Sequence, residues 1–138
     1  MSPISNPFAT IAVHNTGDIV LARRIARQLA EKLGFGRADQ TRLATAVSEL
    51  ARNVIEYADN GECHISDASD ATFRCIKIVV EDHGPGIPDT EQAMQDGYST
   101  GGGLGAGLPG TRRLVDSFLL ESRPGLTRVT ISMSARKG

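Results

Sequence analysis

The chain has 138 residues, of which 40% are apolar and 22% charged, and its formal net charge is -1. This length fits one hydrophobic core, so we expect residues 1–138 to form a single domain. No dense basic run is available for a nucleic-acid backbone, and no window approaches the roughly 18 unbroken apolar residues that a membrane span needs. Neither nucleic acid nor a membrane is therefore expected as a partner.

The cysteine content and the opening segment favour a cytoplasmic protein. Two cysteines, Cys63 and Cys75, are too few for a secreted scaffold held together by disulfides. The opening MSPISNPFAT has neither a basic stretch nor an apolar signal region. The two cysteines could face one another across a hairpin, but two buried free thiols are the simpler expectation in a reducing compartment.

Apolar periodicity predicts two amphipathic helices in the first half of the chain. A short strand over 10–13 is followed by a helix that Thr16 or Asp18 caps and that Gly34 ends. A second helix is expected over 39–57, with its first residue, an aspartate, as the N-cap.

The second half of the chain predicts four strands, a short polar helix and a third main helix. Strands over 62–67 and 73–81 are separated by a polar turn and should form a hairpin. The third helix is expected from Thr111, after a glycine-rich segment. Strands over 119–122 and 128–133, joined by a Pro-Gly turn, close the chain.

Two glycine-containing segments are candidate ligand sites. Asp82 follows directly on a strand of the buried type, where its carboxylate can accept a hydrogen bond from a ligand amino group. Gly84 and Gly86 leave room there for a flat ring, although a plain Gly-Pro turn is the simpler alternative. After a short polar helix expected around 91–96, five of the seven residues 101–107 are glycine. Backbone N–H groups leading into a helix N-terminus suit phosphates, whereas the alternative is a flexible loop.

A polar face on the second predicted helix is a candidate catalytic feature. Glu49, Asn53 and Glu56 lie four and seven positions apart and therefore share one side of the helix. A carboxylate can take the proton of an attacking hydroxyl, and an amide oxygen one turn away can hold Mg²⁺. Taken alone, the pattern is more typical of a solvated helix face.

Other functional signatures fail because their structural context is missing. Gly105, Gly107 and Gly110 match G-x-G-x-x-G, but no strand leads into them, and the Walker A lysine is absent. The G-x-S-x-G at 97–101 has neither a preceding strand nor a later histidine.

The three histidines are not expected to bind zinc. His14, His64 and His83 are scattered, without a helical pair or a cysteine neighbour. Each is therefore predicted to lie on the surface or in a loop.

The order of three motifs carries the strongest functional indication. A helix with Glu49 and Asn53, a strand ending in D-x-G-x-G and a glycine-rich loop opening a helix resemble the N, G1 and G2 boxes of the GHKL ATP-binding family. The segments SELARNVIEYA, VEDHGPGIPD and DGYSTGGGLGAGLPGTRRLVDSF are similar to one branch, the RsbT-type switch kinases of the stressosome. The resemblance extends over about residues 13–133. It implies the GHKL (Bergerat) fold, an α/β two-layer sandwich with a mixed, mainly antiparallel sheet and helices on one face.

The resemblance implies a serine/threonine-protein kinase that uses ATP and Mg²⁺. Glu49 would be the general base, and Asn53 would bind the metal. Asp82 would accept from the adenine amino group, with Gly84 and Gly86 beside the ring. The phosphates would be wrapped by Gly101, Gly102, Gly103, Leu104, Gly105, Ala106 and Gly107.

Two more assignments follow from the resemblance. Residues 89–100 would form the mobile ATP lid. Thr127 would match the family's late threonine near adenine, although Gly125-Leu126-Thr127 has one residue more than the usual Gly-Thr pair.

The implied partners are proteins. Substrates would be STAS-domain scaffold and antagonist proteins of a stressosome, and their phosphorylation would free the kinase to bind and activate a PP2C-type phosphatase. One alternative is an anti-sigma factor of the RsbW/SpoIIAB type, which sequesters a sigma factor and uses its kinase activity to reset its antagonist. Another is a nucleotide-sensing module without turnover. The segment GGGLGAGLPG favours the switch kinase over the anti-sigma factor.

Overall fold

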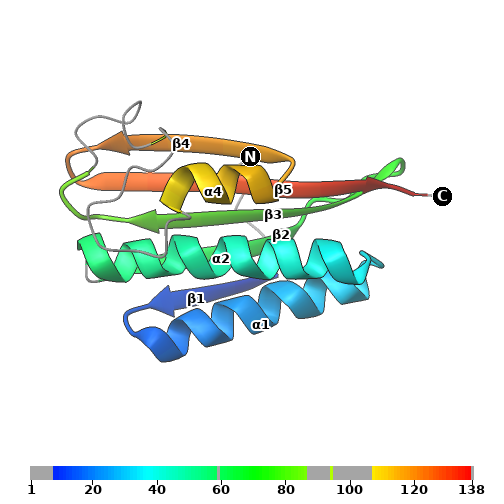
Figure 1. Cartoon of the computed structure of the whole chain (residues 1–138), viewed down its shortest axis with the longest axis horizontal. Coiled ribbons are helices and arrows are strands. Elements are labelled where there is room, and N and C mark those ends of the chain that lie inside the picture. The colour runs from blue at the N-terminus through cyan, green and yellow to red at the C-terminus, as the bar shows by residue number, and fades with distance from the viewer. Residues whose placement is uncertain (1–7, 59, 87–93, 95–106, 138) are drawn as a thin grey trace.

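A computed structural model describes residues 8–58, 60–86, 94 and 107–137. The chain order of its elements can be followed in Figure 1. They are β1 (Ala9–Val13), α1 (Thr16–Lys32), α2 (Arg37–Ala58), β2 (Gly61–Asp67), β3 (Phe73–Asp82), α4 (Gly107–Leu114), β4 (Ser117–Arg123) and β5 (Leu126–Arg136). None of these helices is long and apolar enough to span a membrane.

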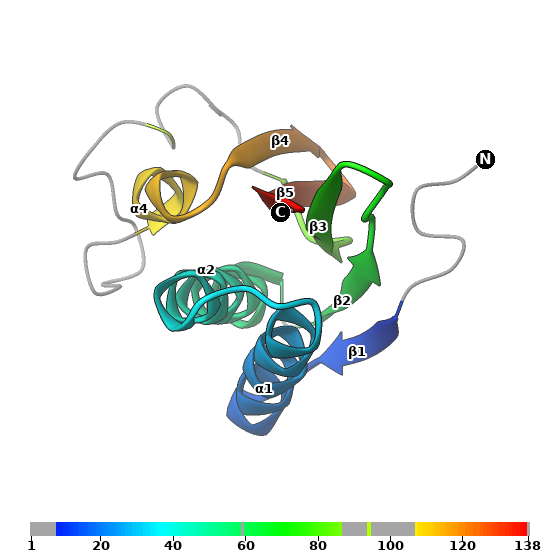
Figure 2. The same cartoon turned by 90° about the vertical axis from the view of Figure 1, so that its right-hand side faces the viewer.

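The strands form one sheet in the order β1-β2-β3-β5-β4, and the three helices lie on one of its faces (Figure 2). This arrangement confirms the expected α/β two-layer sandwich. The sheet was expected to be mixed, but each neighbouring pair in the described part is antiparallel. The connection through α4 makes β4 parallel to β3, and β5 lies between these two strands, so no parallel neighbours arise.

The hydrophobic core fills the space between the helices and the sheet. Its largest apolar side chains are fully buried and come from helices α1 and α2 and from strands β1, β2, β3 and β5. They include Leu29, Leu43, Val47, Leu50, Ile65, Ile76, Ile78 and Ile131. Strand residues of the core alternate with residues of the opposite face, as the pleat requires.

Helix α1 is capped by Asn15, so the predicted caps Thr16 and Asp18 were wrong. The Asn15 side chain accepts a hydrogen bond from the Asp18 backbone N–H at 3.1 Å. The Asp18 carboxylate accepts from the Asn15 backbone N–H at 3.3 Å. Asp18 is thus the third helical residue of a capping box, in which it satisfies an N–H group of the cap.

Helix α2 begins at Arg37, two residues before the predicted N-cap Asp39. The Gly36 carbonyl accepts the first bond of the helix, from the Gln40 N–H at 3.0 Å. Asp39 lies inside the first turn and forms an ion pair with Arg42. The positive end of the helix dipole favours a carboxylate in the first turn. Aspartate is also favoured as an N-cap, so the sequence does not distinguish the two positions.

The predicted hairpin of β2 and β3 is confirmed, with Gly61 opposite Asp82 at its open end. The predicted strands near the C-terminus are also confirmed, although each is longer than expected. Helix α4 starts four residues before the predicted Thr111 and ends at Leu114. Proline is tolerated in the first turn of a helix, so Pro109 does not prevent this earlier start. The short helix expected around 91–96 lies outside the described residues except for Met94.

The two cysteines do not face one another. Cys63 pairs with Val80 across β2 and β3, and Cys75 pairs with Ser134 on β5. Both thiols are free, and only Cys63 is buried, so the expectation of two buried thiols holds for one of them. Burial raises the pKa of Cys63 to about 12.

We predict that Gly61→Ala destabilises the fold where α2 approaches the sheet. A Cβ at Gly61 would overlap the Glu81 carbonyl oxygen and lie 2.8 Å from Val54 Cγ1. Overpacking of this kind lowers the free energy of unfolding by about 1–3 kcal/mol, measurable by urea denaturation. Gly36→Ser is the matched control, because a side chain there meets no atom within 4 Å. Equal stability of Gly61→Ala and wild type would contradict the prediction.

Candidate functional site

Asp82 ends strand β3 on the helix side of the sheet and is only 8% exposed. Its Oδ1 accepts a hydrogen bond from the Gly84 backbone N–H at 3.0 Å. Burial raises the pKa of Asp82, while the Gly84 N–H and the neighbouring His83 act in the opposite direction. Oδ2 receives no hydrogen bond from the residues that the structure places. Asp82 is therefore a buried acceptor with one oxygen available to a ligand.

The two glycines after Asp82 allow the loop to pass between protein segments. A Cβ at Gly84 would lie 2.8 Å from the Ala58 Cβ at the end of α2. Gly86 has a φ of +85°, and a Cβ there would lie 2.5 Å from the Arg123 carbonyl oxygen. Only glycine fits both places without strain. The loop is also held by the hydrogen bond from the Gly125 N–H to the Gly84 carbonyl, at 3.0 Å.

Thr127 lies beside Asp82 in spite of the additional residue after Gly125. The two residues are direct partners across β3 and β5, so they share one side of the sheet. Thr127 is also opposite Ser122 on β4, and the two hydroxyl oxygens are 2.8 Å apart. Leu126, the additional residue, begins β5 opposite Arg123, and Thr127 follows it as the partner of Ser122. Ser122 was not among the predicted site residues, because its position beside Thr127 depends on strand pairing.

Glu49 and Asn53 lie one turn apart on α2, the helix whose end contacts Gly84. Both are partly buried. The Glu49 Oε1 accepts from Arg52 Nη1 at 2.7 Å, and the Glu49 side chain is 12% exposed. Arg52 was missed as a neighbour of the site, although a charge pair three residues apart on a helix was a usable signal. Helix α2 thus carries a carboxylate and an amide one turn apart, and its last residue, Ala58, contacts the loop that follows Asp82.

Residues 38–137 match the family described as histidine kinase-, DNA gyrase B-, and HSP90-like ATPase. The chain is a GHKL ATPase. It is 49% identical over 120 residues to the serine/threonine-protein kinase RsbT of Bacillus subtilis (strain 168). The match covers 87% of this chain and 90% of that protein. Within the GHKL ATPases, the chain belongs with the serine/threonine-protein kinases of the RsbT type.

Solved structures of other GHKL proteins have the same fold. The RsbU and RsbW domains of a Mycobacterium tuberculosis protein match with a TM-score of 0.64 and 16% identity, over 96% of this chain and 34% of that one. The catalytic domain of the histidine kinase ThkA matches with a TM-score of 0.57 and 18% identity, over 92% of this chain and 98% of that domain. The GHKL fold expected from the motifs is therefore confirmed.

The described part of this GHKL ATPase offers oxygen ligands that suit Mg²⁺. The metal prefers one or two protein oxygens, several waters and the phosphates of a nucleotide. Asn53 has an amide oxygen that no described residue occupies, and the Glu49 carboxylate lies one turn away. The donor set at this position of α2 therefore fits the metal that the resemblance implies.

Most of the predicted phosphate loop lies outside the described residues. This applies to the lid at 89–100, apart from Met94, and to Gly101, Gly102, Gly103, Leu104, Gly105 and Ala106. The described chain resumes at Gly107, which is the first residue of α4, and α4 packs against α2 (Figure 2). The loop thus leads into a helix N-terminus as expected, where backbone N–H groups and the helix dipole favour an anion.

The prediction for the histidines was right for two of the three. His14 and His83 are exposed, and His83 Nδ1 lies 3.3 Å from the Gly125 carbonyl oxygen. His64 lies within β2 and is 8% exposed, so its placement on the surface or in a loop was wrong. It is enclosed by polar side chains of neighbouring strands, and sequence spacing alone does not identify these neighbours.

We predict that Asp82→Asn leaves the protein at least as stable as wild type at neutral pH. The amide oxygen can still accept from Gly84, and the buried charge is removed. Because the pKa of Asp82 is raised in the folded state, the wild type loses stability as the pH rises from the unfolded value of about 3.9 through the folded value. The advantage of the variant should therefore vanish in acid. Urea denaturation over a pH series measures this difference.

Asp67→Asn is the control with the opposite sign. Hydrogen bonds from the side chain and the backbone N–H of Ser69 lower the pKa of Asp67. Its carboxylate therefore stabilises the fold above the unfolded pKa, and this contribution is lost as the pH falls. Asp67→Asn should be less stable than wild type at pH 7 and converge with it in acid. A loss of stability in Asp82→Asn at pH 7 would contradict the first expectation.

Proposed function

We propose that this GHKL chain is an ATP- and Mg²⁺-dependent protein kinase that phosphorylates serine or threonine on STAS-domain proteins of a stressosome. One observation carries the nucleotide part of the proposal. Asp82 is buried, one of its carboxylate oxygens accepts no hydrogen bond from a described residue, it lies beside Thr127, and the end of helix α2 contacts the loop that follows it. The similarity to RsbT supports the choice of serine or threonine as acceptor.

In the proposed complex, Asp82 recognises adenine. Its Oδ2 would accept a hydrogen bond from the adenine amino group, while Oδ1 stays bound to the Gly84 N–H. The hydroxyl groups of Thr127 and Ser122 supply further polar contacts at the same side of the sheet. A buried hydrogen-bond acceptor that has no donor carries an uncompensated desolvation cost. A ligand donor that removes this cost therefore contributes strongly to the binding free energy.

In the proposed reaction, Glu49 acts as the general base. The substrate hydroxyl would lose its proton to the Glu49 carboxylate as its oxygen attacks the γ-phosphorus, and the bond from that phosphorus to the ADP oxygen breaks. Arg52 holds one oxygen of Glu49 at 2.7 Å and so orients the carboxylate. Asn53 would hold Mg²⁺, which would supply positive charge near the phosphates.

The proposed cellular role is that of a cytoplasmic switch in a stress response. Phosphorylation of the STAS-domain scaffold would release the kinase, which would then bind and activate a PP2C-type phosphatase. The occurrence of RsbU and RsbW domains in one Mycobacterium tuberculosis protein supports a link between this fold and other signalling domains. The identity of 49% to RsbT favours the kinase over a sigma-sequestering protein.

We predict that Glu49→Gln abolishes phosphorylation and leaves ATP binding intact. A general base contributes about 10²–10⁴-fold to the rate, and the amide cannot take the proton. The measurement is transfer of radiolabelled γ-phosphate from Mg-ATP to the STAS-domain protein encoded nearest this gene. Glu56→Gln is the matched control, since Glu56 is exposed and lies on the same side of α2. This control should label the substrate at the wild-type rate.

Asp82→Asn separates nucleotide binding from catalysis in the same assay. Because the amide places an N–H₂ group where the carboxylate oxygen would meet adenine, ATP affinity should fall at least about tenfold. Binding of ATP by the wild type without any labelling would reject the kinase proposal and favour a nucleotide sensor. Co-purification with a sigma factor would instead favour the anti-sigma alternative.

A further inference from the structure

The sheet face away from the helices carries a row of charged side chains. Cys63 and Ile65 belong to the core, so Glu62 and His64 point to the opposite face of β2. Glu62 lies directly opposite Glu81 on β3, and Glu81 lies opposite Arg128 on β5. Two carboxylates in direct cross-strand register repel one another unless a cation lies between or beside them.

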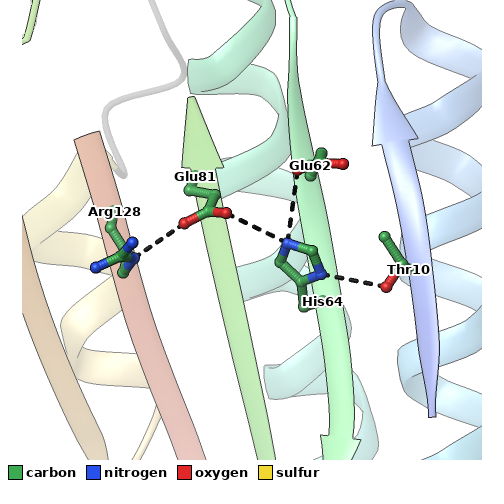
Figure 3. Close-up of polar contacts among 5 residues, drawn as sticks. All are labelled: Thr10, Glu62, His64, Glu81 and Arg128. Atoms are coloured by element: carbon green, nitrogen blue, oxygen red, sulfur yellow. Dashed lines mark hydrogen bonds and ion pairs between the residues drawn. The ribbon is translucent and has the colours of Figure 1, made fainter. Parts of the chain in front are cut away.

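His64 points its free ring nitrogen toward these carboxylates (Figure 3). Its Nε2 is buried and forms no hydrogen bond within the described structure. The nearest carboxylate oxygens are Glu81 Oε1 at 3.4 Å and Glu62 Oε1 at 3.8 Å. The atom is thus within reach of two negative groups and in hydrogen-bond geometry with neither.

Two further contacts hold the group in place. Thr10 Oγ1 on β1 lies 3.2 Å from His64 Nδ1. When Nδ1 carries the proton and donates it to this hydroxyl, Nε2 presents a lone pair to the two glutamates. Arg128 Nε donates to Glu81 Oε2 at 2.9 Å, and this leaves Oε1 directed at His64. Such outer contacts, which orient a ligand histidine and a ligand carboxylate, are characteristic of metal centres.

We propose that Glu62, His64 and Glu81 bind a divalent transition-metal ion of the zinc class. Their ligand atoms all lie within 4.8 Å of one another. In a tetrahedral zinc site with bonds of about 2.0–2.1 Å, neighbouring ligand atoms are about 3.4 Å apart. The distance from His64 Nε2 to Glu81 Oε1 has this value, whereas a hydrogen bond is expected at about 2.7–3.2 Å.

The chemistry of the three ligands selects the class of metal. Imidazole nitrogen with carboxylate oxygens suits Zn²⁺ and its neighbours, whereas Mg²⁺ prefers oxygen ligands and retains its waters. Three protein ligands leave a fourth position for water. The site is separate from the nucleotide site, because Glu81 and Asp82 are consecutive in β3 and point to opposite faces. Zinc binding should therefore not require ATP.

The test is titration of untagged, metal-free protein with ZnCl₂ by calorimetry, in excess Mg²⁺ and without nucleotide. The visible spectrum with Co²⁺ provides a second reading of coordination. We expect one ion per chain, and an affinity reduced about 100-fold or more in His64→Asn and Glu81→Gln. Thr10→Val, which removes only the contact to Nδ1, should reduce it about tenfold.

Matched variants separate this site from other metal-binding groups. His14→Asn and Cys75→Ser remove an exposed histidine and a partly exposed thiol, and both should bind zinc like wild type. Asn53→Ala should also bind zinc like wild type, since it alters only the proposed nucleotide-linked position. Glu62→Gln, in contrast, alters a proposed ligand. Because this side chain is 51% exposed, the substitution should leave the fold intact, so a change in zinc binding cannot be attributed to misfolding.

Two results would overturn the proposal. One is zinc and cobalt binding that is unchanged in both Glu62→Gln and His64→Asn. The other is the absence of any zinc or cobalt uptake by folded wild-type protein.

Discussion

The close approach of helix α2 to the ends of β2 and β3 is the constraint on which the proposed nucleotide site depends. Gly61 and Gly84 lie where a Cβ would collide with Val54 and Ala58. This contact holds the end of the helix against the loop that follows Asp82, a residue that is only 8% exposed. The same contact fixes where the polar side of α2 lies relative to the strand end. Packing at two glycines thereby sets both the dielectric surroundings and the position of the acidic group.

Strand β3 separates two kinds of chemistry by the alternation of its side chains. Asp82 points to the helices and to the proposed nucleotide, while Glu81 points to the open face and to His64. A shift of one residue in register would exchange these two carboxylates, so pairing along the whole strand is required at both sites. Buried Ile76 and Ile78 determine that register because they must face the core.

Local patterns predicted the elements well, and they failed where partners come from distant parts of the chain. Apolar periodicity located α1 and α2, but it did not distinguish an N-cap from a carboxylate in the first turn, as at Asp18 and Asp39. Motif order made Asp82 a candidate site residue, and this role stays a prediction. The position of Thr127 beside it required the strand register, and the surroundings of His64 required contacts with β1 and β3.

The burial of Asp82 shows how a binding site can oppose stability. Asparagine would satisfy the Gly84 N–H equally well and would avoid the desolvation that raises the pKa of Asp82. Only the carboxylate, however, presents an acceptor at both oxygens, and a ligand amino group needs an acceptor. A ligand that donates to Oδ2 stabilises the charge in the folded state alone, so its binding free energy adds to that of folding. In the proposed complex, the group that would give the site its affinity is therefore the same group whose burial opposes folding, and this coupling would link nucleotide binding to the stability of the β3 end.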